Sequence, residues 1–223
     1  MARALTLLAL AAPEAPADAL ARYSVGRRDQ ELLGLRERIF GPRMTGSAQC
    51  PACGQAVDVD FSVADVRAQA AGDPDQIHVL QGAGFEVRFR LPRCDDLASL
   101  DPGADPRAQK AALLRRCVAE ARLDGEPAAA DSLPEPVAAA LSHRMAELDP
   151  QGDIQLNLTC PNCGHLWAPP LDIVSYLWNE IQAWAPRMLR DVHAVASAYG
   201  WREADILALG PWRRQAYLEM IRQ

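Results

Sequence analysis

Two copies of the motif Cys-Pro-X-Cys-Gly, at residues 50–54 and 160–164, constrain the fold of this chain more than any other feature. The spacing lets both sulfurs of a pair turn to one side of a tight knuckle, and the following glycine permits the backbone to turn. One knuckle supplies half of a tetrahedral metal site, and a second completes it. We therefore predict one structural zinc ion (Zn2+) per chain as cofactor, with the metal ligands Cys50, Cys53, Cys160 and Cys163.

Strand-like sequence flanks both knuckles. Val57–Phe61 alternates apolar and acidic residues, and Ile154–Leu158 alternates and runs into the second pair, as half-buried strands do. The pattern predicts a zinc ribbon with an unusually long insertion, because 106 residues separate Cys53 from Cys160. The ion would then tie two distant segments into a single domain.

Other interpretations of the cysteines remain open. Redox pairs of the thioredoxin kind need a strand-to-helix setting, and disulfide bonds need an oxidising compartment. His165 is an alternative ligand, two residues past Cys163. Cys94 and Cys117 fit neither knuckle and are expected to be thiols of the core. A shell of four cysteines has no open position for water, so the sequence favours a protein that is not an enzyme over a zinc hydrolase.

The remaining patterns predict an α+β fold that is mainly helical, with a small antiparallel zinc-ribbon element. Helices are expected over residues 16–40, 107–122 and 134–147, and a further strand over 85–91. We expect three parts: an N-terminal helical segment (1–48), a zinc-ribbon region with strands and a helical insertion rich in Ala, Asp and Pro (49–170), and a C-terminal helical subdomain (171–223).

The C-terminal part has the strongest periodicity. From Asp172 to Tyr199, apolar residues recur every three or four positions, which places them on one helix face. Pro186 is expected to kink or split this helix. Two short helices are expected to follow, over Glu203–Leu209 and Pro211–Ile221, the second with proline at its first position.

All five tryptophans fall in the last 57 residues. They could form the core of a small helical subdomain or serve as anchors for a protein partner, because tryptophan is enriched at interface hot spots. The two interpretations can hold for different residues. The candidates for partner binding are Trp178, Trp184, Trp201 and Trp212.

Composition limits the other partners. A net charge of −6 gives no electrostatic reason to bind nucleic acid or an anionic membrane, and no apolar run is long enough to cross a bilayer. Ala4–Ala12 is either a signal peptide or a short amphipathic helix, and two CxxC pairs favour a reducing compartment. We expect a cytoplasmic protein without a small-molecule substrate.

Several longer stretches of the chain resemble one family of proteins. The first is Cys160-Pro-Asn-Cys-Gly-His-Leu-Trp167, and the similarity also covers the first knuckle and Phe89-Arg-Leu-Pro92. The stretches that are most specific to the family follow in the C-terminal part: Asp172-Ile-Val-Ser-Tyr-Leu-Trp-Asn-Glu180, Asp191-Val-His193, Ala198-Tyr-Gly-Trp-Arg-Glu-Ala-Asp-Ile-Leu207 and Arg213-Arg-Gln-Ala-Tyr-Leu218.

These stretches resemble a family of baseplate proteins of contractile phage tails. The family is related to the baseplate hub and hub-assembly proteins of such phages and occurs with tail-like contractile injection systems. The resemblance implies a structural or assembly protein that binds other baseplate or hub proteins and can be incorporated into a phage-tail-like particle. It leaves open whether the protein stays in the particle or acts as a chaperone. The alternative is a zinc ribbon that binds nucleic acid in transcription.

Overall fold

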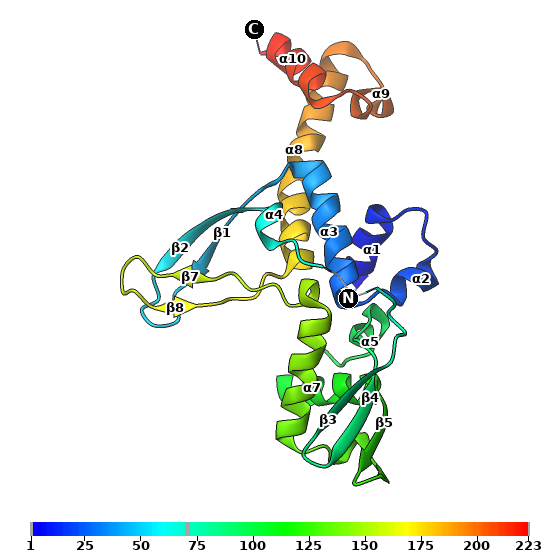
Figure 1. Ribbon diagram of the computed structural model, residues 1–223. Coiled ribbons are helices and arrows are strands. Elements are labelled where there is room, and N and C mark those ends of the chain that lie inside the picture. The colour runs from blue at the N-terminus through cyan, green and yellow to red at the C-terminus, as the bar shows by residue number, and fades with distance from the viewer. Residues whose placement is uncertain (1, 70–71, 223) are drawn as a thin grey trace. The chain divides into compact units, whose positions relative to one another are not determined.

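The computed structural model describes residues 2–69 and 72–222. The chain forms two compact units, Met1–Val174 and Ser175–Gln223 (Figure 1). It is 53% helical and 19% strand, and its sheets are small and antiparallel, which confirms the predicted α+β class. Among the described residues, no helix is both long enough and apolar enough to span a membrane.

The first unit begins with three helices rather than one long one. They are α1 (Ala2–Ala11), α2 (Ala17–Ala21) and α3 (Val25–Phe40). The helix expected over residues 16–40 is interrupted because Ser24 adopts an extended conformation and accepts a hydrogen bond from the amide of Arg27, which caps α3. Gly41, with φ 86°, follows α3. The chain then enters strand β1 (Arg43–Gln49), so the helical segment predicted to reach residue 48 stops at Phe40.

The middle of the first unit is a four-stranded antiparallel sheet in the order β3-β4-β5-β6. The elements of this region are β3 (His78–Gly82), β4 (Phe85–Phe89), α5 (Cys94–Ala98), α6 (Pro106–Cys117), β5 (Val118–Leu123), β6 (Glu126–Ala128), the 3-10 turn η1 (Ala130–Ser132) and α7 (Glu135–Leu148). The helix predicted over 107–122 was therefore too long. Residues 118–123 form β5 because they pair with β4, where Ala121 lies opposite Val87.

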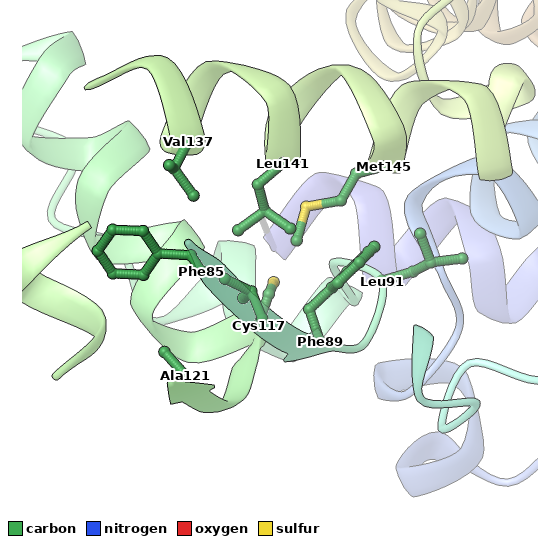
Figure 2. Close-up of a cluster of buried hydrophobic side chains, with 9 residues drawn as sticks. Phe85, Phe89, Leu91, Cys117, Ala121, Val137, Leu141 and Met145 are labelled. Carbon is green, nitrogen blue, oxygen red and sulfur yellow. The ribbon is translucent and has the colours of Figure 1, made fainter. Parts of the chain in front are cut away.

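One face of this sheet packs against α7 (Figure 2). On α7, Val137, Leu141 and Met145 recur every four residues and so share one side of the helix. The sheet and its flanks contribute the other buried members, which are Phe85, Val87, Phe89, Leu91, Cys117 and Ala121. The opposite face of the sheet carries charged residues, among them Arg122, which donates to Glu120 at 2.8 Å. The sheet is thus buried on one side.

The two cysteines outside the knuckles are buried, as predicted for core thiols. Cys94 begins α5 and Cys117 ends α6, and both have exposed fractions of at most 1%. Burial raises the pKa of Cys94 to about 11 and that of Cys117 to about 12. Both thiols are therefore neutral at physiological pH.

The segment that leads into the second knuckle is attached to α3. Asp149 accepts a hydrogen bond from the amide of Gly26 at 2.8 Å, and a Cβ on Gly26 would lie 2.0 Å from that carboxylate. The 3-10 turn η2 (Pro150–Gly152) follows, and its buried Gln151 accepts from the amide of Ala68 at 2.6 Å. Gln151 also donates to the carbonyl of Val66 at 3.4 Å, so η2 lies beside helix α4 (Val63–Val66), which follows the first ribbon hairpin.

The second unit is built from helices α8 (Ile173–Tyr199), α9 (Glu203–Leu207) and α10 (Pro211–Ile221); the unit boundary falls in the first turn of α8. Pro186 lies inside α8, which continues through it as one helix instead of splitting. The core of the unit consists of Val192, Val195, Ile206 and Leu218. This small cluster joins all three helices.

Candidate metal centre

Two hairpins carry the four knuckle cysteines at their tips. Strand β1 pairs with β2 (Ala56–Ser62) up to Gln49↔Ala56, immediately before and after the first knuckle. Strand β7 (Leu158–Thr159) pairs with β8 (Leu166–Trp167) up to Thr159↔Leu166, around the second knuckle. The hairpins lie side by side at one edge of the first unit (Figure 1), and their cysteine sulfurs come within 4.8 Å of one another.

The two knuckles have the same backbone hydrogen bonds. In each, the amide of the first cysteine donates to the carbonyl five residues later, and the glycine amide donates back to that cysteine's carbonyl, at 2.8 to 2.9 Å. The glycines have φ values of 73° and 71°, a conformation that residues with a Cβ rarely adopt. The bonds are Cys50–Gln55, Gly54–Cys50, Cys160–His165 and Gly164–Cys160. This shared geometry explains the shared motif.

The sulfur positions fit a tetrahedral metal ion. The sulfurs of Cys50 and Cys163 are 3.7 Å apart, and those of Cys53 and Cys160 are also 3.7 Å apart. A tetrahedron of sulfurs bound to zinc at about 2.3 Å has edges of about 3.8 Å. A disulfide would bring two sulfurs to about 2.05 Å. All four cysteines are free thiols, so the donor set suits a soft divalent ion.

The environment of the sulfurs differs around the centre. The amide of Gln55, and after it the side chain of Asn162, lower the pKa of Cys53 to about 6. The amide at His165 lowers the pKa of Cys163, but the sulfur of Cys53, burial and the other two sulfurs outweigh it and raise the pKa to about 12. Metal binding requires thiolates, so loading the site releases protons.

His165 does not join the sulfurs. Its ring stacks on Trp167, with 6.3 Å between the ring centroids. In the part of the chain that the structure describes, the group of side chains that could hold a metal ion contains the four cysteines and no histidine. The residues brought together are thus the four that the sequence singled out.

Asn162 is a feature of the centre that the sequence analysis did not single out. It occupies the variable position of the second knuckle, and its side-chain amide donates to the sulfur of Cys53 in the first knuckle at 3.7 Å. The first knuckle has Ala52 at that position, which cannot donate. The two motifs differ at this position, but the difference alone does not indicate that the asparagine faces a sulfur of the other knuckle. The hydrogen bond links the two knuckles directly.

Replacing Asn162 by alanine should therefore weaken metal retention. Outer-shell partners of metal ligands typically change affinity by about 10- to 100-fold, and we expect about tenfold faster transfer of the ion to a chelator. The measurement is metal release followed with a colorimetric chelator. Asn157→Ala, at an exposed asparagine just before β7, is the control and should release metal like the wild type. Equal rates for all three proteins would contradict this role.

The four tryptophans proposed as partner anchors occupy different settings. Trp201 packs edge-on against Tyr217, with 4.8 Å between centroids, and contacts the core of the second unit. Trp212 is 81% exposed at the start of α10. Trp178 and Trp184 lie on α8. One of the four, Trp201, is therefore a packing residue, and Trp212 is the most exposed of the large apolar side chains that the structure describes.

The α+β fold and the two cysteine knuckles define a class of protein in which four clustered cysteines could hold a metal ion, and in which the four-stranded sheet is inserted between the two ribbon hairpins. The family model described as "T4 bacteriophage base plate protein" matches residues 13–167. The chain belongs to this family. The match includes both knuckles and ends at Trp167, before the C-terminal stretches on which the resemblance seen in the sequence most depended. No curated protein and no solved structure matches the chain.

Proposed function

We propose that this protein is a structural or assembly protein of the baseplate of a contractile phage-like tail or injection system, where it binds other baseplate proteins. The observation that carries the proposal is the family match over residues 13–167, which spans most of the first unit and both knuckles. In such a particle the chain would act by contact with its neighbours. The exposed apolar residues of the second unit supply candidate contacts.

The metal centre supports this role by holding the ribbon together. We infer that the ion is zinc, bound by all four cysteines, because four thiolates complete a tetrahedral shell and leave no position for water or substrate. Each ribbon sheet has two strands, and two-stranded sheets are marginal in water without further support. The ion would therefore supply the stability that the ribbon cannot obtain from a core of its own.

A zinc ribbon that binds nucleic acid is less well supported by the charges near the knuckles. Asp58 and Asp60 alternate with Val57, Val59 and Phe61 along β2, and both aspartates are exposed. Their carboxylates would repel a phosphate backbone. Arg43 offsets one of them, because it forms an ion pair with Asp60.

The partner surface that we assign to the second unit is a stripe on α10. Trp212, Ala216 and Met220 recur every four residues, and Trp212 and Met220 are 81% and 55% exposed. The helix turns Leu218 to the core of the unit instead. An exposed tryptophan beside a flexible methionine is typical of surfaces that bind another protein. We call Trp212, Ala216 and Met220 the α10 stripe.

Cells that make contractile particles test the proposed function directly. Deleting the gene that encodes this chain should leave the cells without complete baseplates, as seen by electron microscopy of particle preparations. Supplying the wild-type gene in trans should restore the baseplates. Normal contractile particles in the deletion strain would contradict the proposal. Mass spectrometry of restored particles then separates a permanent component, present at fixed stoichiometry, from an assembly factor that leaves.

The Trp212→Ala variant should fold like the wild type but fail to restore particles in that strain. Removing an exposed side chain changes stability little, whereas truncating an interface anchor typically costs about 2 kcal/mol or more in binding. Trp201→Ala is the contrasting variant, because it removes packing from the core and should lower the thermal midpoint. Full restoration by Trp212→Ala would show that the α10 stripe is not a partner surface.

A further inference from the structure

A second surface lies in the first unit, beside the outermost strand of the four-stranded sheet. A hollow of about 200 Å3 opens between the β3–β4 hairpin and α7, lined mainly by Leu80, Phe85, Pro136, Val137 and Ala140. Figure 2 shows Phe85 and Val137 next to each other at one end of the buried cluster. Sites for small molecules usually have volumes of about 300–1,000 Å3, so the hollow suits a single apolar side chain better.

The backbone next to the hollow can accept another strand. β3 is an edge strand, and its hairpin closes at Gly82↔Phe85 through Ala83 and Gly84, both with positive φ. In an antiparallel ladder every second residue turns its N–H and C=O away from the neighbouring strand. With the hairpin closed in this register, the residues of β3 that face the open edge are Val79 and Gln81.

The far end of this groove carries a positive charge. Arg144 lies one helical turn beyond Ala140, about 6 Å along α7. Helix α7 packs against β3. Burial, and after it the Arg144 guanidinium, lower the pKa of His78, the first residue of β3. Arg144 donates one N–H to Glu147 at 2.8 Å, and about half of its side chain (47%) is exposed. Part of the guanidinium therefore faces solvent.

We propose that this groove binds an extended segment of another protein, which pairs antiparallel with β3. The N–H and C=O groups of Val79 and Gln81 would bond its backbone, as in other complexes formed by strand addition. One apolar side chain of the segment fills the hollow. Because same-face residues of a strand are about 6.8 Å apart, an acidic side chain two positions later meets Arg144.

The size of the hollow and the charge of Arg144 together define the partner. It presents an exposed segment with an apolar residue followed two positions later by Asp or Glu. The groove lies wholly within the first unit and is made of other residues than the α10 stripe. The inference adds a second binding surface to the proposed function, and binding to it can be measured on the purified chain without any particle.

Selection from a random peptide library against the full-length, metal-loaded chain tests the proposal. Enriched peptides should share an apolar residue and an acidic residue two positions later. Amide hydrogen exchange of the chain should slow at Val79 and Gln81 when such a peptide is added. Enriched peptides without this pattern, no enrichment, or protection elsewhere on the chain would overturn the proposal.

Two substitutions of one residue separate strand addition from other modes of binding. Gln81→Pro removes the outward N–H and blocks the edge, while edge strands tolerate proline because that N–H makes no bond to β4. Gln81→Ala keeps the N–H. We expect Gln81→Pro to weaken peptide binding by about tenfold or more and Gln81→Ala to bind like the wild type, with both variants folded by circular dichroism.

Two further experiments test the role of the Arg144 charge and the identity of the segment that occupies the groove. Arg144→Glu should reverse the preference, so that a selected peptide binds better with lysine at the acidic position. Sedimentation of the free chain identifies the other possible occupant, a second copy. A dimer whose formation Gln81→Pro abolishes would show that the groove pairs two copies of this chain, and would overturn the proposal of a foreign segment.

Discussion

Replacing Cys160 by serine should abolish stoichiometric metal binding and unfold the ribbon. A serine hydroxyl is a poor ligand for a soft divalent ion, and structural zinc contributes about 10–16 kcal/mol of binding free energy in zinc-finger peptides. We expect the ribbon to depend on that energy because β7 and β8 have two residues each and form a sheet of their own. We expect amide exchange to accelerate over residues 43–62 and 154–170, with metal content near zero.

The four-stranded sheet should survive this change. Its core, which includes Phe89 and Leu141, contains no knuckle residue. Hydrogen exchange measured residue by residue should therefore show protection retained in β4 and β5. Cys94→Ala, which removes a buried thiol outside the knuckles, is the control and should keep one ion per chain. A Cys160→Ser protein with wild-type exchange in both hairpins would show that the metal does not stabilise the ribbon.

The second large effect is expected at Asp96, which is 1% exposed at the start of α5. Its carboxylate accepts two hydrogen bonds from the Arg90 guanidinium, one of them at 2.8 Å. It also accepts one from the backbone amide of Arg93 at 2.9 Å. Arg116 adds a third donor at 3.3 Å. Asp96→Ala leaves these groups without their acceptor, and breaking a buried pair in this way typically costs about 3–5 kcal/mol. Unfolding by denaturant at neutral pH measures the loss.

Asp95→Ala is the matched control for Asp96→Ala. The side chain of Asp95 is 39% exposed and pairs with Arg93 at 3.2 Å, so its loss should cost about 0–1 kcal/mol. A cost for Asp96→Ala as small as that of the control would contradict the role assigned to the buried carboxylate.

The dependence of stability on pH tests the same hydrogen-bond network around Asp96. Burial raises the pKa of Asp96, but the hydrogen bonds from Arg90 and the amide of Arg93 outweigh burial and hold the pKa below the usual value of 3.8. Because the folded-state pKa is depressed, the stabilisation is present above that value and is lost as the pH falls below it. The acid-induced loss of stability should be smaller in Asp96→Ala than in the wild type.

The metal centre was predictable from the sequence because its chemistry depends on a few residues with fixed spacing. The two Cys-Pro-X-Cys-Gly motifs predicted the grouping of the four sulfurs across an insertion of 106 residues. The hydrogen bond from Asn162 was not predictable in the same way. It depends on how the two knuckles face each other, and a single asparagine in a motif carries no such information.

The helix expected over 107–122 shows where the sequence was insufficient for the fold. Leu113, Cys117 and Ala121 follow one another at intervals of four residues and do contribute to one core. The change from α6 to β5 at Val118 was missed because it is set by pairing with β4, a contact distant in sequence. Local periodicity identified the buried residues here but not the element that carries them.

In helix α8, by contrast, the apolar periodicity was a better guide to the element than a single residue was. Pro186 was expected to kink or split the helix, and the helix is not split, because it runs from Ile173 to Tyr199. Its apolar periodicity continues past the proline, and Val192 and Val195 pack against Ile206 and Leu218. Proline removes one hydrogen bond and strains the turn before it, a cost of about 3 kcal/mol that packing along the rest of a long helix can offset.

Native mass spectrometry of the purified chain tests the central claim most directly, which is that the four knuckle cysteines hold one structural zinc ion. The mass should exceed that of the metal-free chain by one zinc ion less the protons released from the thiols. The extra mass should disappear in Cys160→Ser. Two results would contradict the claim. One is a metal-free wild-type chain with its knuckle cysteines joined in disulfides. The other is a wild-type chain whose unfolding temperature is the same before and after treatment with a chelator.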